Sequence, residues 1–182
     1  MLLSCPAAVS AIKAGKIIAY PTEAIYGLGC DPHNHAVLSR LLKLKSRADN
    51  KGLILVASNQ SQLNPFIDIQ NPLVLERANK SWPGPVTWIM PASKTCHPLL
   101  TGNRSTIAVR ISAHPVVRAL CNGCELALVS TSANISGEYP LTNVQDIADA
   151  FASDIAGIVD GPLGGLEDAT SIFDATTGVQ LR

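Results

Sequence analysis

The stretch KLKSRADNKGLILVA, residues 43–57, contains the change from helix to strand that sets the fold class. Apolar residues such as Leu41 and Leu42 recur on one face of a predicted helix over residues 35–45, at about 100° per residue. The run GLILVA, residues 52–57, is short and apolar and follows a loop, which predicts a central, buried strand. A helix followed directly by a buried strand is typical of α/β proteins.

Short helices and strands alternate along the rest of the chain as well. Further helices are predicted over residues 5–15, 61–67, 71–80, 115–121 and 143–151, and further strands over 16–20, 86–90, 106–112, 126–133, 156–160, 170–175 and 179–182. Residues 21–30, PTEAIYGLGC, are predicted to form a loop, because Gly and Pro are too frequent there for a regular element. The 182 residues, 47% of them hydrophobic, predict a single domain over 1–182 with a mixed sheet.

Charge and hydropathy exclude several classes of protein. The 14 basic and 14 acidic side chains cancel, so no chain-wide attraction to nucleic acid or to an anionic membrane is expected. The N-terminus lacks a basic leader followed by a long apolar run, and no stretch approaches the roughly eighteen apolar residues of a membrane span. We therefore expect a cytoplasmic protein without membrane contact, in which any basic site is local.

The five cysteines do not form a disulfide framework, since their number is odd and their spacing irregular. Cys121 and Cys124, in CNGC, have the spacing of half a zinc site. A tetrahedral site needs two more ligands, however, and only Cys96 and His97 offer another close pair. We therefore favour reduced cysteines in a turn between helix and strand, and no protein-bound metal.

The local basic site is the cluster in KLKSRADNK. Lys45 projects from the same side of the predicted helix as its leucines, at the very end, where a solitary ammonium is costly to desolvate without an anion. The helix dipole also favours a cation at a helix C-terminus, and this alternative needs no ligand. Arg40 and Lys43 are expected to face solvent, whereas Lys45, Arg47 and Lys51 resemble a rim that faces an anion.

Two further stretches and one arginine carry groups suited to a ligand. VSTSANISG, residues 129–137, places small hydroxyl and amide groups at the end of an apolar strand, where α/β sheets usually hold ligands, although a capping turn explains the same residues. YPTEAIYGLG has glycines that permit close approach to a ligand, but it matches neither the Rossmann nor the Walker pattern. Arg110, inside an apolar strand, must face a carboxylate of the protein or of a ligand. Together they predict a cationic, hydroxyl-lined cleft for an anionic small molecule or a nucleotide.

The same stretches resemble a known family, the YrdC-like threonylcarbamoyl-AMP synthases. The similarity lies in YPTEAIYGLGCDP, the Lys-x-Arg of KLKSRADNKGLILVA, WPGPVT, AVRISAHP, the Ser-x-Asn of STSANISG, and SIFDATTGVQLR, in the family's order over nearly the whole chain. The resemblance implies the short, single-domain bacterial branch, with a twisted mixed β-sheet flanked by helices around a central, positively charged cavity. Two positions depart from the family pattern: Ala48 replaces a proline, and Thr170-Ser171 replaces Ser-Thr.

The resemblance implies a nucleotidyltransferase that condenses L-threonine, bicarbonate and ATP to threonylcarbamoyl-adenylate and pyrophosphate. The product would be passed to a threonylcarbamoyl-transfer complex for the t6A modification of tRNA. Magnesium is the expected cofactor, carried by ATP as Lewis acid and phosphate bridge rather than held by a protein cage. Positioning and electrostatic stabilisation would supply most of the catalysis, since negative charge grows on the departing pyrophosphate.

The resemblance also implies roles for individual residues. Lys45 and Arg47 are expected to be catalytic and to hold the ATP phosphates, and the other expected ATP contacts are Lys51, Ser132, Asn134 and Arg182. The threonine pocket is expected to contain Thr22, Tyr26, Arg110, Ser130 and Ser171, with Arg110 neutralising the amino-acid carboxylate. For one cavity to exist, the Lys45 ammonium and the Asn134 amide must lie close together.

Two alternative functions remain open. A non-catalytic module that binds double-stranded RNA or tRNA would also use a basic concavity, but zero net charge and few aromatics (4%) argue against more than weak tRNA binding. Carbamoyl-adenylate formation, as in the related domain of hydrogenase maturation proteins, would require zinc-finger and acylphosphatase parts, for which this sequence has no motif.

Overall fold

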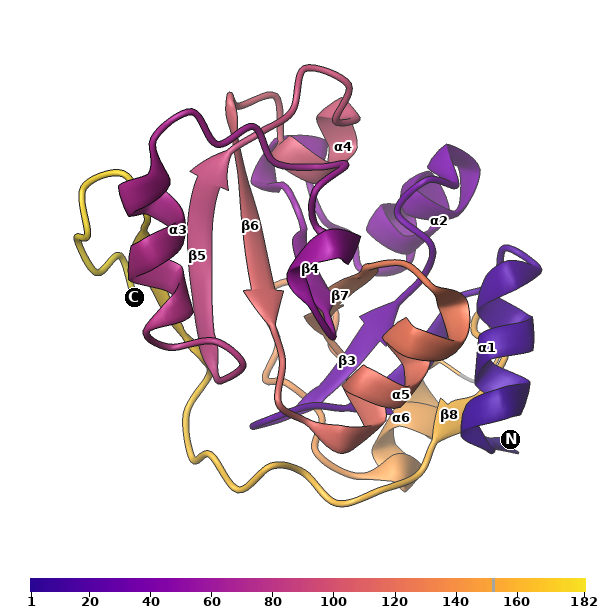
Figure 1. Ribbon diagram of the computed structural model, residues 1–182. Helices are drawn as coiled ribbons and strands as arrows, with labels where there is room; N and C mark the ends of the chain where they lie inside the picture. The colour runs from indigo at the N-terminus through magenta and orange to yellow at the C-terminus, as the bar shows by residue number, and fades with distance from the viewer. Residues whose placement is uncertain (152) are drawn as a thin grey trace.

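The computed structural model describes residues 1–151 and 153–182 (Figure 1). Within this part of the chain, nine strands form one sheet in the order β1-β8-β2-β3-β7-β4-β6-β5-β9. They are β1 (Leu2–Leu3), β2 (Ile18–Pro21), β3 (Tyr26–Gly29), β4 (Ile54–Ala57), β5 (Val86–Pro91), β6 (Thr106–Ile111), β7 (Leu128–Ser132), β8 (Ile158–Val159) and β9 (Ser171–Asp174). The pairs β1/β8, β2/β8, β4/β6 and β5/β9 are parallel, and the other four are antiparallel. The prediction of a mixed sheet is confirmed.

Helices connect most of these strands. The described residues form α1 (Cys5–Lys13), α2 (His35–Leu44), α3 (Pro72–Asn79), α4 (Pro98–Thr101), α5 (Pro115–Cys124), α6 (Val144–Phe151) and the 3-10 helices η1 (Asp49–Lys51) and η2 (Gln60–Gln62). The side chains of Ser4, Asn34 and Asn71 accept hydrogen bonds from the first turns of α1, α2 and α3, which fixes where these helices begin. Among the described helices, none combines the length and the apolar character needed to cross a bilayer.

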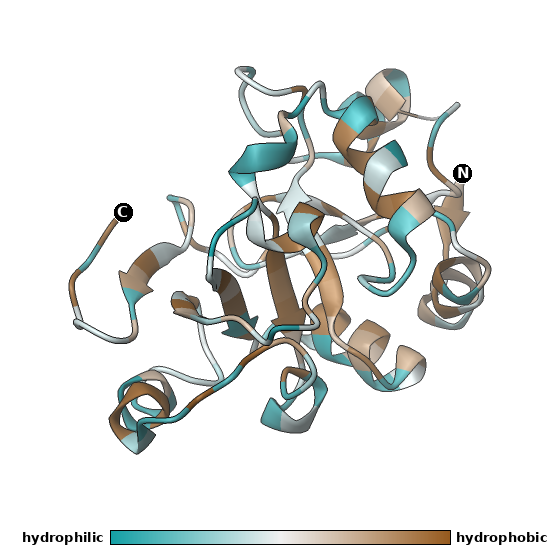
Figure 2. Ribbon diagram, turned by 90° about the horizontal axis from the view of Figure 1, so that it is seen from above, coloured by the Kyte–Doolittle hydropathy of each residue, from teal (hydrophilic) through white to brown (hydrophobic). Residues whose placement is uncertain are grey.

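Alternate residues of a strand point to opposite faces of the sheet, so each face has its own apolar side chains. A different set of helices packs on each face. On one face Ile18, Tyr20, Val56 and Leu128 pack with buried residues of α1 and α5. The larger cluster combines the other alternate positions, such as Leu55, with buried residues of α2, α3, α4 and α6. Figure 2 shows the hydrophobic strands in the interior and many hydrophilic residues on the outer helices and loops. The sheet is therefore the middle layer of the fold, and twisted strands with flanking helices agree with the predicted class.

Strand β3 lies inside the stretch that the sequence predicted as a loop, and that prediction is wrong. Residues Tyr26–Gly29 pair with β2 on one side and with β7 on the other. A side chain at Gly29 would collide with the Val129 carbonyl oxygen and with the ring of the buried Tyr20, so glycine is needed there. The glycines of this stretch mark a close approach within the sheet rather than a turn.

No element was predicted at β1, η1 or α4. Most of the other predicted elements lie within a few residues of their predicted positions, with three exceptions. The helix predicted over 61–67 is wrong, because only η2 forms and turns follow it around Pro65, which lacks an amide hydrogen. The strand predicted over 179–182 is reduced to a single bridge between Phe173 and Gln180 in an exposed tail. CNGC forms the last turn of α5, not a turn after it.

Candidate active site

A cavity of about 220 Å³ lies over the middle of the sheet. Strands β3, β7, β4 and β6 contribute residues to it, as do the loop between β2 and β3, Pro140, and the segment that leads into β9. Arg47, from the loop after α2, and Arg182, from the tail, complete the lining. Segments from the first and the last quarter of the chain therefore meet at one place.

The strand register explains why the floor of this cavity is polar. Val56 pairs with Leu128 and with Arg110, and Ile54, two residues earlier, pairs with Ser130. Residues two apart share a face, so Arg110 and Ser130 lie on the same face as the buried Val56 and Leu128. Helix α5 packs on the apolar part of that face, and the cavity occupies the part with arginine and hydroxyl side chains.

Three arginines, Arg47, Arg110 and Arg182, line the cavity. Arg47 donates through Nε and Nη2 to the Gly52 carbonyl oxygen over 3.2 and 2.9 Å. Arg182 Nη2 donates to the Thr170 carbonyl oxygen over 2.7 Å. Burial lowers the pKa of both guanidinium groups, and a neighbouring arginine adds to each shift. A guanidinium has five N–H donors, so these backbone contacts orient the side chains and still leave donors for an anion.

Lys45 is almost fully buried, with 1% of its surface exposed. Its Nζ donates to the carbonyl oxygens of Ser132 and Asn134 over 2.5 and 2.6 Å, and to Asn134 Oδ1 over 3.1 Å. Lys45 and Asn134 therefore converge, as the sequence analysis requires. The three acceptors use all three ammonium hydrogens, and Lys45 is not a lining residue of the cavity. Burial, with Arg47 nearby, lowers the pKa of Lys45 to about 8.

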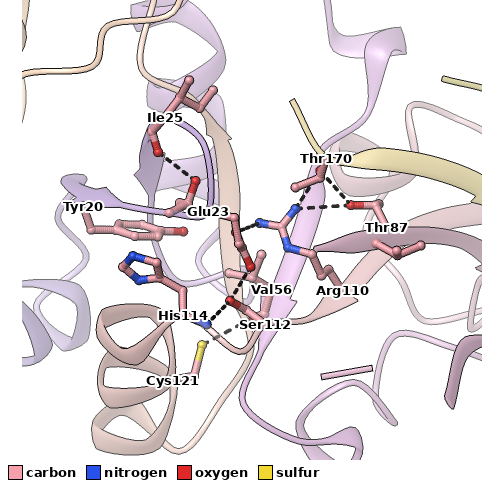
Figure 3. Close-up of polar contacts among 12 residues, drawn as sticks. Tyr20, Glu23, Ile25, Val56, Thr87, Arg110, Ser112, His114, Cys121 and Thr170 are labelled. Carbon is pink, nitrogen blue, oxygen red and sulfur yellow. Dashed lines mark hydrogen bonds and ion pairs between the residues drawn. The ribbon is translucent and has the colours of Figure 1, made fainter. Parts of the chain in front are cut away.

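Arg110 meets a carboxylate of the protein, a question that the sequence left open (Figure 3). Its Nη2 lies 3.0 Å from Glu23 Oε2, and its Nη1 donates to the hydroxyls of Thr87 and Thr170 over 3.2 and 3.0 Å. Ser112 Oγ donates to the other oxygen of Glu23 over 2.6 Å. Figure 3 shows these side chains converging from the β2–β3 loop, from β6 and from the segment before β9. Arg110 is thus held in place without any ligand.

Most of the predicted site residues line the cavity. Their individual roles remain predictions. Lining residues among them are Thr22, Tyr26, Arg47, Arg110, Ser130, Ser132 and Arg182. The Tyr26 hydroxyl donates to the Gly161 carbonyl oxygen over 3.1 Å, so part of its hydrogen-bonding capacity is already used. Lys45 and Asn134 support the turn after β7, while Lys51, on the exposed η1, and Ser171, on β9, do not line the cavity. Thr170 lines it in place of Ser171.

Sequence reasoning missed Glu23 and Thr87. Glu23 is the one acidic residue of YPTEAIYGLG, and a buried arginine in a strand needs a carboxylate, so these two signals together could have found the pair. Nothing in the sequence marks Thr87. It reaches Arg110 because β5 pairs with β6.

Within residues 1–151 and 153–182, no group of three or more His, Cys, Asp or Glu side chains is arranged to hold a metal ion. Cys121 and Cys124 are buried free thiols on α5. Burial raises their pKa values to about 12 and about 11, which keeps both thiols neutral and disfavours the thiolate that a zinc ion requires.

A mixed sheet that carries a hollow lined by arginines and hydroxyls defines an α/β protein with a site suited to an anionic small molecule. The particular group can also be named: the chain belongs to the Sua5/YciO/YrdC family, whose description reads "Telomere recombination" and whose profile matches residues 10–182. The resemblance read from the sequence is confirmed.

Two relatives illustrate this membership. A protein of Xylella fastidiosa named threonylcarbamoyl-AMP synthase is 47% identical over 182 residues, which is 99% of this chain and 97% of the relative. A protein of Coxiella burnetii with the same name is 46% identical over 175 residues, covering 96% of this chain and 94% of the relative. The chain therefore matches these proteins over nearly their whole length.

Solved structures agree with the fold. P. abyssi Sua5 complexed with L-threonine matches with a TM-score of 0.88 and 30% identity over 94% of this chain. The match covers 51% of that protein, so this chain spans about half the length of Sua5. E. coli YciO matches with a TM-score of 0.82 at 24% identity, which supports the fold alone. The predicted twisted mixed sheet with flanking helices is confirmed.

Proposed function

We propose that this chain is a threonylcarbamoyl-AMP synthase, which joins L-threonine, bicarbonate and ATP into threonylcarbamoyl-adenylate and releases pyrophosphate. One observation carries the proposal: the Lys-x-Arg and Ser-x-Asn segments, far apart in sequence, meet through Lys45 and Asn134 beside a cavity lined by arginines. In addition, proteins with this name are 47% identical to the chain over 99% of its length.

The amino acid is proposed to bind at the Arg110 end of the cavity. Thr170 connects two arginines there, because its hydroxyl accepts from Arg110 and its carbonyl oxygen accepts from Arg182. Ser130 adds a hydroxyl from β7, which β4 separates from the Arg110 strand β6. Guanidinium and hydroxyl groups are suited to a carboxylate and to the threonine side chain, and L-threonine is the molecule with which P. abyssi Sua5 is complexed.

The triphosphate is proposed to bind at the Arg47 and Ser132 end. The threonine nitrogen condenses with bicarbonate to form a carbamate, and a water molecule is lost. A carbamate oxygen then attacks the α-phosphorus of ATP while the bond to the bridging oxygen breaks, and the electron pair of that bond leaves with pyrophosphate. Arg47 would neutralise the growing charge directly. Lys45 would add its positive charge through the turn that carries Ser132 and Asn134, which orients that turn before the substrates arrive.

Magnesium is proposed to enter as a complex with ATP, where it would act as Lewis acid. The donor set of the described residues supports this arrangement, since it offers no group of three carboxylate, imidazole or thiolate ligands. The threonylcarbamoyl-transfer complex as recipient of the product, weak tRNA binding and a cytoplasmic location are predictions of the same proposal.

Pyrophosphate release by the purified protein tests the proposal, with threonine, bicarbonate and ATP omitted in turn. We expect release only when all three are present. The rival RNA-binding module predicts binding of double-stranded RNA that weakens steeply with salt, and no threonine-dependent release. That result would contradict the proposed reaction.

A further inference from the structure

We propose that Glu23 is a positioning residue, which holds the Arg110 guanidinium in the orientation that receives the carboxylate of the amino acid, and that Ser112 in turn holds Glu23. Glu23 itself is not a lining residue of the cavity, so it acts through Arg110. The inference rests on the proposed function for the identity of the amino acid, and on the structure for the geometry.

The two oxygens of the Glu23 carboxylate have different partners. Oε2 lies 3.0 Å from Arg110 Nη2, and Oε1 accepts from Ser112 Oγ over 2.6 Å. The two charged side chains are only 5% and 8% exposed, so water cannot replace either partner. A rotation of the carboxylate would break both contacts at once, and this fixes the plane of the guanidinium.

The backbone around Glu23 is fixed as well, by the strap of residues 161–166. The amides of Gly164 and Leu166 donate to the carbonyl oxygens of Thr22 and Glu23, each over 3.0 Å. Gly164 lies against the Glu23 backbone so closely that a side chain there would collide with it.

Ser112, the other support, is held from the far side. Its hydroxyl oxygen accepts from the His114 amide over 3.0 Å, and His114 Nε2 lies 3.1 Å from the Pro162 carbonyl oxygen. His114 therefore connects Ser112 back to the strap, through its amide on one side and its ring on the other. Glu23 is consequently fixed on its side-chain end and on its backbone end by the same segment of chain.

This arrangement is costly for stability and suited to recognition. Buried ion pairs contribute little net stability because both charges lose their hydration. In addition, neither Glu23 Oε2 nor Arg110 Nε has a hydrogen-bond partner of good geometry among the described residues. The ion pair is therefore not arranged to maximise stability. With Nη1 engaged by Thr87 and Thr170 and Nη2 facing Glu23, Nε is the guanidinium nitrogen that lacks a partner among the described residues. A ligand carboxylate thus meets an arginine whose orientation is already fixed by contacts of Nη1 and Nη2.

Three variants test the proposal against a matched control. Glu23→Gln removes the charge and keeps the shape, Glu23→Asp keeps the charge at a shorter reach, and Ser112→Ala removes one hydroxyl behind Glu23. The control is Ser58→Ala, since Ser58 is also buried and hydrogen-bonded, but to Gln62 and Asn122 outside the cavity. For each variant, KM for threonine and for ATP is measured, and the Arg110 Nε–H resonance is followed by NMR without substrates.

We expect KM for threonine to rise about tenfold in Glu23→Gln and about threefold in Ser112→Ala, with KM for ATP within about twofold. Glu23→Asp should recover part of the loss, and the Arg110 resonance should shift or broaden in Glu23→Gln and Ser112→Ala. Ser58→Ala should lower stability without either change. If Glu23→Gln does not fold, Glu23→Asp and Ser112→Ala still test whether Glu23 positions Arg110.

Two results would overturn the proposal: an equal effect of Ser58→Ala and Ser112→Ala on KM for threonine, or an unchanged Arg110 resonance in Glu23→Gln and Ser112→Ala. A wild-type protein without threonine-dependent pyrophosphate release would contradict the proposed function instead. The NMR comparison would then still test the positioning role, because it needs no substrate.

Discussion

Two buried cations, Lys45 and Arg110, meet the cost of burial in different ways. Lys45, 1% exposed, is surrounded by three uncharged oxygen atoms of Ser132 and Asn134. Arg110, 4% exposed, has the Glu23 carboxylate 3.0 Å away. Dipoles stabilise a charge but leave it a net charge, whereas a carboxylate cancels most of the field at a distance. The two ends of the site therefore differ in net charge although each contains a buried cation.

This difference fits two different ligands. A triphosphate carries several negative charges and is drawn to uncompensated positive charge, which Lys45 and Arg47 supply at one end. An amino acid carries a single carboxylate beside an ammonium group. Arg110, compensated by Glu23, offers it directed donors, and with Arg182 beside it this end carries less net charge than the Lys45 and Arg47 end. Under the proposed function, the arrangement would keep ATP phosphates from occupying the threonine pocket.

Removal of the Arg110 charge should have the largest effect. Arg110→Met leaves the Glu23 carboxylate buried without its partner, so we expect the free energy of unfolding to fall by about 3–5 kcal/mol. Urea denaturation monitored by circular dichroism measures this change. The double variant Arg110→Met/Glu23→Leu should recover most of the loss, and a double variant as unstable as the single one would show that the pair does not carry the cost.

Sequence information indicated that both cations are buried, but it did not identify the partner of either one. The helical position of Lys45, on the side of the leucines and at the end of the helix, indicated a buried ammonium that needs an anion, whereas in the structure uncharged oxygens of Ser132 and Asn134 surround it. The pattern could not indicate that these acceptors belong to the protein, because Ser132 and Asn134 come close only through the order of strands in the sheet.

The same limit explains the errors in the fold. Strand β3 was predicted as part of a loop because local composition counts glycine as a turn residue. Glycine is needed at position 29 because of the contacts with Tyr20 and Val129, and Val129 lies a hundred residues further along the chain. Thr87 was missed for a similar reason, since its contact with Arg110 depends on the pairing of β5 with β6. Local periodicity predicted most helices and strands. The contacts between their side chains depend on the tertiary arrangement, which the local pattern does not specify.

Truncation of Lys45 should have the next largest effect, and on turnover rather than on threonine binding. In Lys45→Ala the turn at Ser132 and Asn134 loses its common donor, and the phosphate end loses a net charge. We expect turnover to fall at least tenfold, which corresponds to about 1.4 kcal/mol. Steady-state pyrophosphate release measures it, with threonine affinity from calorimetry as the control. Wild-type turnover in this variant would remove Lys45 from the site.

Deprotonation of Lys45 should reproduce part of that loss. Because the pKa of Lys45 is lowered to about 8, roughly a tenth of the ammonium remains at pH 9, and turnover should fall up to about tenfold between pH 7 and pH 9. The free energy of unfolding should not fall with turnover over this pH range. The folded pKa lies below the ordinary value of 10.5, so the unfolded chain binds more protons between the two, and the Lys45 contribution to the free energy of unfolding rises with pH in this range.

The pH dependence of turnover, measured beside thermal unfolding at each pH, separates the two effects. Lys45→Ala is the control, since its residual activity should lack the decline above pH 8. A decline of the same size in Lys45→Ala would assign the titration to another group and would remove the contrast with Arg110.

The smallest effect concerns the loop that joins Lys45 to Arg47 and η1. Ala48 has φ −64° and ψ 138°, values that a proline adopts, and no described backbone hydrogen bond uses its amide. Ala48→Pro should therefore raise the free energy of unfolding by about 0.4–1 kcal/mol, mainly by restricting the unfolded chain. Thermal unfolding detects the gain as a higher Tm.

The loop carries Arg47 and not Arg110. Any change in KM in Ala48→Pro should therefore concern ATP and not threonine. A destabilised variant would mean that the loop backbone does not accept proline at this position. An altered KM for threonine would mean that the two ends of the site are coupled and not independent, as their separate hydrogen-bond partners indicate.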